Sequence, residues 1–341
     1  MRYRTLGKSP LKVSEVAFGT GDNAGVMVHG SSKEQLELVE RAITLGINLF
    51  DTSAAYGRSA AEVNLGRVLQ DLGAKDALVS TKALIPPHDM HRIGDKIRDS
   101  VDESLFRLRR ESVDVLLLHN PMRAGANPLN PLITPLTSAQ VLEQALPAMI
   151  RAREQGKARF LGLACDESET TSVLPVLDSG EFAMINFTYN LANPSAALHV
   201  EGIPPHENFE GLFAAAAKHR TWVAVVRPLA GGALAGAMLE KGLAALHDLS
   251  RGYFRMLPQV HGPMLENARR FGFLNRPGEQ TLAQAAYKFI LAHPQVSTVI
   301  GGFSDITQME EAVSAIDAPP LPASDQARIS EVHRTGFGKA A

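Results

Sequence analysis

The sequence predicts an α/β protein with a (β/α)8 TIM-barrel fold, organised as a single domain over residues 1–341. Eight short apolar runs recur along the chain with apolar residues at consecutive positions, which is typical of strands buried on both faces of a parallel sheet. Amphipathic stretches with a period of 3.6 residues separate these runs. The composition also changes little along the chain. Together these observations favour one barrel over an open doubly wound sheet, which is the second choice.

The eight predicted strands set the frame for the other elements. They lie in chain order at residues 16–18, 47–50, 77–80, 113–118, 160–164, 183–187, 222–226 and 296–300. Because each strand of a parallel barrel must be followed by a crossover, a helix is expected after each of them.

The helices predicted between the strands carry recognisable start and stop signals. Two clear examples cover residues 33–45 and 93–109, each with one apolar and one charged face. Ser31 and Ser32 precede Lys33 and Glu34, so a capping box is expected at the start of the first helix. Glycines that follow predicted helices or precede predicted strands mark further chain reversals, at Gly46, Gly73, Gly156 and Gly180.

Two long segments interrupt the regular alternation, and both follow the carboxyl end of a strand. Residues 121–138 contain four prolines, too many for a helix or a central strand. Residues 230–278 are rich in glycine at first and then weakly helical. Active sites of barrels are built at the carboxyl ends of the strands, so these segments are candidate substrate and cofactor loops. The alternative is that they are surface insertions.

The composition excludes several classes of protein. The chain has 34 Lys and Arg against 36 Asp and Glu, and this net charge of −2 argues against a general nucleic-acid-binding surface. A single cysteine, Cys165, cannot form an intrachain disulfide. No apolar run approaches the roughly 18 residues of a membrane span, and the first residues do not resemble a signal peptide. We therefore expect a cytoplasmic protein that has no membrane partner.

Four polar residues come at or just after the ends of three consecutive predicted strands. Asp51 follows the second strand, with Tyr56 in the loop beyond it, Lys82 follows the third and His119 follows the fourth. Each could have an ordinary structural role alone, as a turn cap or a solvated strand end. Parallel strands end on the same face of a barrel, so we expect the four side chains to converge on one pocket.

These residue types suit the reduction of a carbonyl group. Hydride transfer to a carbonyl carbon leaves an alkoxide that needs a proton, and a phenol is a weak donor unless a cation lowers its pKa. Lys82 is expected to be that cation, held by Asp51, while His119 orients the substrate oxygen toward Tyr56. The hydride must come from a cofactor.

The sequence resembles the aldo-keto reductase family along almost its whole length. The matching motifs are Tyr-Arg-Thr-Leu-Gly at 3–7, Leu-Lys-Val-Ser at 11–14, Phe-Asp-Thr-Ser-Ala-Ala-Tyr-Gly at 50–57, Ser-Thr-Lys at 80–82, Leu-Leu-Leu-His-Asn at 116–120, Gly-Lys-Ala-Arg-Phe-Leu-Gly at 156–162, Tyr-Asn at 189–190, Pro-Leu-Ala-Gly-Gly at 228–232 and Val-Ile-Gly-Gly at 299–302. The resemblance implies an N-terminal β-hairpin that closes the barrel floor. It also implies NAD(P)(H)-dependent oxidoreduction, with the four residues above as the catalytic tetrad.

The resemblance also implies a cofactor site, in which several positions depart from the family pattern. The expected cofactor-binding positions are Cys165, Asn186, Val226, Arg227, Pro228, Leu229, Gly302, Ser304 and Gln308. Ala164 and Cys165 replace a serine and an asparagine, of which the asparagine binds the nicotinamide carboxamide, and Asn186 replaces a glutamine. Cys165 is expected either to fill space in the core or to face the pocket with its thiol. Val226 replaces a stacking aromatic residue.

The choice of cofactor stays open at this point. The resemblance implies NADP(H), but Ser304 and Ala312 stand where the family often has a cation for the 2′-phosphate and an asparagine near the adenine. Asp305 would repel a 2′-phosphate and could accept a hydrogen bond from a 2′-hydroxyl, so NAD(H) is also possible. Arg227 or the 230–278 segment could instead supply a phosphate partner.

Three readings of function remain. The first is an oxidoreductase acting on a small aldehyde, ketone or sugar alcohol, in a substrate pocket shaped by loops 20–32, 121–138 and 201–208. The second is a cofactor- or ligand-binding barrel with a regulatory role and little turnover, and the third is a lyase or isomerase. We expect no metal site, because His88 and His91 have no third ligand nearby in sequence. Both a monomer and a small homo-oligomer are compatible with the sequence.

Overall fold

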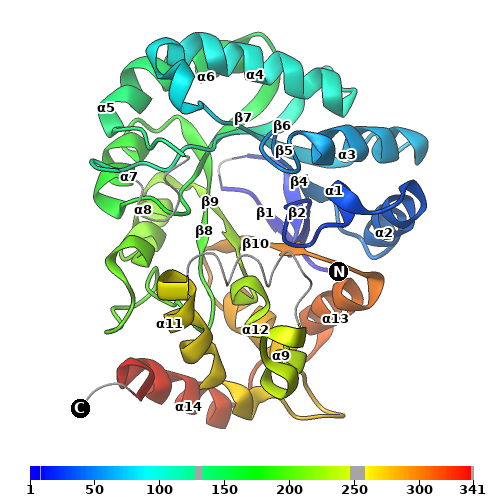
Figure 1. The fold of residues 1–341 in the computed structure, drawn as a ribbon, viewed down its shortest axis with the longest axis vertical. Coiled ribbons are helices and arrows are strands. Elements are labelled where there is room, and N and C mark those ends of the chain that lie inside the picture. The colour runs from blue at the N-terminus through cyan, green and yellow to red at the C-terminus, as the bar shows by residue number, and fades with distance from the viewer. Residues whose placement is uncertain (8, 127–132, 246–257, 339–341) are drawn as a thin grey trace.

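A closed barrel of eight parallel strands forms the centre of the protein (Figure 1). The computed structural model describes residues 1–7, 9–126, 133–245 and 258–338. The barrel strands, each hydrogen-bonded to the next, are β3 (Val16–Gly19), β4 (Leu49–Asp51), β5 (Leu78–Ala83), β6 (Val113–Leu118), β7 (Ala158–Ala164), β8 (Phe182–Thr188), β9 (Trp222–Val226) and β10 (Val296–Gly302), and β10 closes onto β3. All eight predicted strands are present, so the predicted (β/α)8 architecture is confirmed.

The helices surround the barrel, with α4 and α6 on one side and α12 and α13 on the opposite side in Figure 1. They are α1 (Val26–His29), α2 (Ser32–Thr44), α3 (Ala60–Asp71), α4 (Ile93–Leu108), α5 (Ser138–Gln140), α6 (Leu146–Glu154), α7 (Thr170–Leu177), α8 (Leu212–His219), α9 (Gly236–Lys241), α11 (Pro258–Arg269), α12 (Leu282–Leu291), α13 (Ile306–Asp317) and α14 (Ala323–Arg334). No helix among the described residues is both long enough and apolar enough to cross a membrane.

The start and the end of α2 follow the predicted local chemistry. The Ser31 hydroxyl accepts a hydrogen bond from the Glu34 amide, and the Glu34 carboxylate accepts one from the Ser31 amide, which completes a capping box. After the helix, Gly46 takes a φ of +85°, a left-handed conformation that an L side chain rarely adopts.

A β-hairpin closes the floor of the barrel, as the family resemblance implied. Strand β1 (Tyr3–Thr5) pairs antiparallel with β2 (Lys12–Ser14). Leu6 and Val13, from the turn and from β2, pack against inward-facing barrel residues such as Trp222. The lumen is therefore filled from below, and the opposite end of the barrel is left for chemistry.

Alternation along each strand separates two cores. Leu49, Val115 and Met184 belong to the core inside the barrel, whereas their strand neighbours Phe50 and Leu116 belong to the core between the strands and the helices. Following the same alternation upward, Asp51 and Lys82 lie on the inward face of β4 and β5. The two residues therefore project into the lumen near its carboxyl end.

The two long segments differ in structure. Within 121–138, Met122 pairs with Leu136 in a parallel bridge, and residues 127–132 lie outside the described residues. The described part of 230–278 is largely helical, with a 3-10 turn at Ala230–Gly232 followed by α9 and α11, and residues 246–257 lie outside the description. Both segments follow the carboxyl ends of strands, β6 and β9, as predicted.

Candidate active site

A buried ion pair joins Asp51 and Lys82 at the carboxyl end of the barrel. The Lys82 Nζ lies 2.6 Å from Asp51 Oδ2 and donates a second hydrogen bond to the Thr52 carbonyl at 2.8 Å. The other carboxylate oxygen, Oδ1, accepts a hydrogen bond from the Ser80 hydroxyl at 2.7 Å. Both charged side chains are almost fully buried. Burial acts to lower the pKa of Lys82, but the interactions with Asp51 and Tyr56 together outweigh it and hold that pKa above its ordinary value, so the ammonium is charged.

The phenol of Tyr56 lies over this ion pair. Lys82 Nζ is 4.8 Å from the centroid of the Tyr56 ring. Burial raises the pKa of Tyr56, and the positive charge of Lys82 opposes that rise. Tyr56 is therefore a protonated phenol at neutral pH, and a fixed cation stands ready to stabilise the phenolate if the proton leaves.

An unusual backbone conformation follows Tyr56 in the loop between β4 and α3. Gly57, Arg58 and Ser59 have φ values of +56°, +52° and +76°, and positive φ is uncommon for residues with a side chain. The carboxylate of Asp22, in the loop after β3, accepts a hydrogen bond from the Gly57 amide at 2.7 Å. Two loops are thus tied together beside the phenol. The sequence did not point to Asp22, because its partner lies 35 residues away.

His119 completes the group of four. Its ring meets Tyr56 edge to face, with centroids 5.8 Å apart and an interplanar angle of 88°. Burial, helped by the positive charge of Lys82, lowers the pKa of His119 to about 3, so the imidazole is neutral at physiological pH. Its Nδ1 lies 2.9 Å from the Ser53 hydroxyl, a partner that the sequence did not reveal. The structure thus brings all four predicted residues together.

The neutrality of His119 predicts a level pH profile for carbonyl reduction. A ring with a pKa of about 3 stays unprotonated from pH 5 upward, and Tyr56 keeps its proton until the pH passes its raised pKa. We expect kcat/KM for reduction to be constant between about pH 5 and 8 and to fall only at high pH. The reverse oxidation needs the phenolate and should rise with pH.

The pH profile needs a control, because a second buried group could titrate in the same range. Burial raises the pKa of Glu207 to about 7, so this group could add an inflection of its own. Steady-state rates of the Glu207→Gln variant separate the two sources. An inflection near pH 6.5 that survives in this variant would contradict the assignment of a neutral His119.

Asn186 lies at the same end of the barrel, near the end of β8. It alternates with the outward-facing Ile185 and Phe187 on β8, so its side chain is on the inward face. It is 2% exposed. Its amide is not among the buried side-chain atoms that lack a hydrogen-bond partner in the described residues, and an inward-facing amide at this end of the barrel is suited to the carboxamide of a nicotinamide.

A family model supplies the deciding comparison: that of the "Aldo/keto reductase family" matches residues 15–334. The chain belongs to the aldo/keto reductase family. Among curated relatives, the L-galactose dehydrogenase of Arabidopsis thaliana is 28% identical over 337 residues, covering 97% of this chain and 93% of that protein. The L-glyceraldehyde 3-phosphate reductase of Escherichia coli K12 is 27% identical over 97% of this chain and 92% of its own length.

Two further comparisons extend this finding. A protein named probable voltage-gated potassium channel subunit beta, from Arabidopsis thaliana, is 25% identical over 94% of this chain and 93% of its own length. The holo form of an aldo-keto reductase from Bacillus halodurans superposes with a TM-score of 0.71 at 22% identity, covering 100% of this chain and 97% of that one. The family prediction is confirmed, and the chain is an oxidoreductase of the NAD(P)H-dependent aldo-keto reductase type.

Cys165, named above as a cofactor-binding position, does not face the barrel lumen. In this aldo-keto reductase Cys165 is fully buried and packs with Leu161 and Leu163 in the core between the strands and the helices. Burial raises the pKa of its thiol, and nearby Asp166 adds to the shift. Strand alternation turns Cys165 outward, so its thiol is a small core group. Val226 lies on the inward face of β9 and is partly exposed there.

Arg227 lies among acidic side chains. Its Nη2 is 2.8 Å from Asp166 Oδ2 and 3.7 Å from Glu167 Oε1, both in the loop after β7. Its φ is +53°, so the chain turns sharply before Pro228, which is buried, and Leu229, which is half-buried. A phosphate at Arg227 would have to compete with two carboxylates, and its predicted role as a phosphate partner gains no support from this placement.

The remaining predicted cofactor positions form the start of α13. Gly302 is exposed at the end of β10. The Asp305 carboxylate accepts a hydrogen bond from the Gln308 amide at 2.9 Å, and the Ser304 amide donates to the Gln308 side chain at 3.1 Å. Ser304, Asp305 and Gln308 thus cap the helix, and Asp305 remains exposed to any ligand that approaches Gly302. Ala312, expected near the adenine, is buried within α13.

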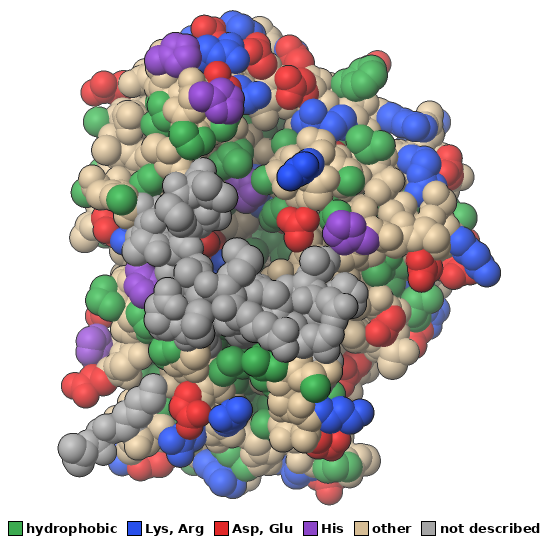
Figure 2. Space-filling model, viewed as in Figure 1, with side chains coloured by type: hydrophobic (Ala, Val, Ile, Leu, Met, Phe, Trp, Pro, Cys, Tyr) green, Lys and Arg blue, Asp and Glu red, His purple; other side chains and the backbone are tan. Residues whose placement is uncertain are grey.

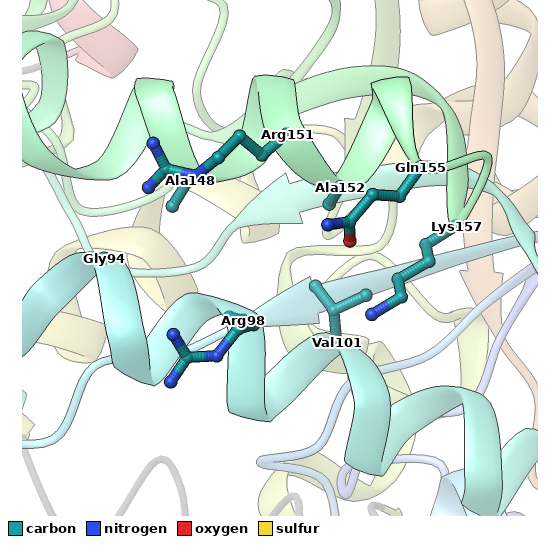
Figure 3. Close-up of a pocket in the computed structure, with 8 residues that line it drawn as sticks. All are labelled: Gly94, Arg98, Val101, Ala148, Arg151, Ala152, Gln155 and Lys157. Atoms are coloured by element: carbon teal, nitrogen blue, oxygen red, sulfur yellow. The ribbon is translucent and has the colours of Figure 1, made fainter.

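Acidic and basic side chains are largely mixed on the rest of the surface of this aldo-keto reductase. Figure 2 shows acidic and basic side chains interspersed over the visible face. A shallow pocket between α4 and α6 collects the cations Arg98, Arg151 and Lys157 (Figure 3). Arg98 already pairs with Asp95, and Lys157 pairs with Asp102 at 2.5 Å. This pocket lies on the outer helical layer and is separate from the group formed by Asp51, Tyr56, Lys82 and His119. The described residues contain no group of three or more potential metal ligands.

Proposed function

We propose that this aldo-keto reductase interconverts the carbonyl and alcohol forms of a small hydroxylated aldehyde or sugar, using a nicotinamide cofactor. The observation that carries the proposal is the cation of Lys82, held by Asp51 at 2.6 Å and lying 4.8 Å from the Tyr56 ring centroid. A protein that only binds ligands has no need to place a buried cation against a phenol.

The residues divide the work of proton transfer. A bound reduced nicotinamide supplies the hydride, and Asn186 and Val226 are the residues that would hold its ring. Tyr56 donates its hydroxyl proton to the carbonyl oxygen as negative charge develops there. Lys82 stabilises the resulting phenolate, and Asp51 keeps the ammonium in position. In the direction of oxidation the same phenolate takes the proton of the alcohol.

The substrate class is supported by two sources. Two relatives, an L-galactose dehydrogenase and an L-glyceraldehyde 3-phosphate reductase, have names that denote hydroxylated substrates. The predicted substrate loops also contain two polar side chains, Arg123 and His206, and polar side chains suit substrate hydroxyl groups better than an alkyl chain.

The residues at the start of α13 bear on the choice between NAD(H) and NADP(H). Asp305 exposes a carboxylate beside the path of a ligand at Gly302, and Ser304 carries no charge. An exposed carboxylate repels a 2′-phosphate and accepts a hydrogen bond from a 2′-hydroxyl. We therefore propose that NAD(H) is used at least as well as NADP(H). The lone, buried Cys165 is in keeping with a reducing compartment, the cytoplasm.

The test is a turnover assay with four arms. L-Galactose oxidation and glyceraldehyde reduction are measured with NAD(H) and with NADP(H), and an alkyl aldehyde of similar size is the control. We expect a kcat/KM at least tenfold higher for the hydroxylated substrates, since sites built for hydroxyl groups reject analogues without them by larger factors still. A preference for the alkyl aldehyde would overturn the substrate class, and a strong preference for NADP(H) would overturn the cofactor choice.

A regulatory binding role is the second candidate, favoured by the relatives named as potassium channel subunits. The same assay separates the two functions. Tight binding of NADH or NADPH by calorimetry, together with turnover below one per minute on all substrates, would favour the binding role.

A further inference from the structure

Ser53 lies between the ion pair and the histidine, in the loop that follows β4. It is fully buried. Its hydroxyl oxygen is 2.9 Å from His119 Nδ1 and accepts a hydrogen bond from the Ala55 amide at 3.1 Å. No other hydrogen bond of this hydroxyl occurs within the described residues.

Counting donors and acceptors decides the direction of the bond to His119. A hydroxyl has one proton to donate and can accept two hydrogen bonds. If Nδ1 carried the imidazole proton, Ser53 would accept from both Nδ1 and Ala55, and its own proton would have no acceptor in a buried place. A buried donor left unpaired is costly, whereas donation from Ser53 to a bare Nδ1 satisfies every group.

We propose that Ser53 is a positioning residue that fixes His119 as the tautomer with its proton on Nε2. The neutral ring can then donate through one nitrogen alone, the one turned away from Ser53. Within the described structure that Nε2 has no protein partner, which leaves it for the oxygen of a substrate bound beside Tyr56. Since neutral imidazole carries one proton, the opposite tautomer would present a bare nitrogen that repels a carbonyl oxygen.

The environment of the ring agrees with this assignment. The Lys82 ammonium and burial both disfavour a second proton on His119, as its pKa of about 3 reflects. The ring therefore carries a single proton at physiological pH. The nitrogen that holds this proton decides whether the ring can donate a hydrogen bond to the substrate oxygen. The acidic group nearest to Ser53 along the chain, Asp51, is already satisfied by Lys82 and Ser80.

The direct test is nitrogen NMR of the whole protein labelled with 15N-histidine. The His119 signals are identified by their absence in the His119→Gln variant. We expect an unprotonated type of shift for Nδ1 and a protonated type for Nε2, unchanged between pH 6 and 8. The reverse assignment in the wild-type protein would overturn the proposal. This measurement needs no turnover, so its result is independent of whether the proposed function is correct.

Variants of Ser53 connect the tautomer to catalysis, and this part rests on the proposed function. In Ser53→Ala we expect a mixture of tautomers and a loss of about tenfold to a hundredfold in kcat/KM for the carbonyl substrate, smaller than the loss of about 10²- to 10³-fold typical of removing a donor outright. The affinity for the cofactor should not change. Ser53→Thr keeps the hydroxyl and should restore the tautomer and most of the activity.

The matched control is Ser100→Ala, which removes another buried serine hydroxyl, on α4. It should leave both the His119 signals and the kinetics unchanged. A Ser53→Ala protein that keeps the wild-type tautomer would contradict the proposal, whatever its activity. Loss of activity with an unchanged tautomer would assign Ser53 a structural role in the loop.

Discussion

Replacing Tyr56 with phenylalanine is expected to lower kcat/KM for carbonyl reduction by about 10²- to 10⁴-fold, the usual contribution of a general acid. Phenylalanine keeps the ring between Lys82 and His119 but removes the proton that the carbonyl oxygen needs. The alkoxide would then have to take its proton from water, which Lys82 does not hold in place as a donor. The measurement is the steady-state rate of reduced-cofactor consumption by the purified variant.

The affinity for cofactor distinguishes this effect from general damage. The hydroxyl of Tyr56 has no part in the proposed contacts to the nicotinamide, so the calorimetric dissociation constant should change less than about threefold, or about 0.6 kcal/mol. Tyr3→Phe is the matched control, because Tyr3 donates to the Gly46 carbonyl on the barrel floor, far along the chain from the site. Wild-type turnover in Tyr56→Phe would refute the proposed proton transfer.

Removing Asp51 is expected to cause the largest loss of stability. In Asp51→Ala the Lys82 ammonium stays buried, with the Thr52 carbonyl as its remaining hydrogen-bond acceptor. Breaking one partner of a buried ion pair typically costs about 3–5 kcal/mol in the free energy of unfolding. Urea unfolding followed by circular dichroism measures this loss. Activity should fall as well, because the Thr52 carbonyl alone then holds the cation beneath Tyr56.

A double-mutant cycle isolates the contribution of the pair. Lys82→Met fills a similar volume without charge, so Asp51→Ala combined with Lys82→Met should lose less stability than the two single changes added together, with a coupling of about 0.5–3 kcal/mol. Glu37→Ala is the control, since its partner Lys33 lies 3.7 Å away and both side chains are exposed. That change should cost less than about 1 kcal/mol. Additive losses at Asp51 and Lys82 would contradict the proposed coupling.

The strands were predictable because burial on both faces leaves a local mark in the sequence. Their exact limits were not. The run at 47–50 predicted a strand from residue 47, yet β4 begins at Leu49. The reason is a long-range contact, because the Asn48 side chain accepts a hydrogen bond from the Ser14 amide at 2.8 Å and donates to the Lys12 carbonyl at 2.9 Å. The side chain of Asn48 is thus hydrogen-bonded to β2 of the hairpin below the barrel.

The convergence of the four proposed catalytic residues was predictable for a similar reason, whereas the surroundings of the proposed cofactor positions were predictable only in part. Asp51, Lys82 and His119 converge because parallel strands end on one face, a rule that needs only the order of the strands. Cys165 was named as a cofactor-binding position with core packing as the other interpretation, and the fold shows core packing, because a strand turns successive side chains to opposite faces. Arg227 seemed available for a phosphate until the fold brought Asp166 within 2.8 Å of it.

The sequence by itself determined the barrel, its family and the four residues at its carboxyl end, because apolar periodicity and strand order are properties of the chain. The tertiary structure alone decided which groups hold those residues. Ser53 and His119 are 66 positions apart, and Ser80 and Asp51 are 29 apart. No local pattern records such a pair, since a hydroxyl becomes a hydrogen-bond partner only when folding excludes water and brings the two groups within about 3 Å.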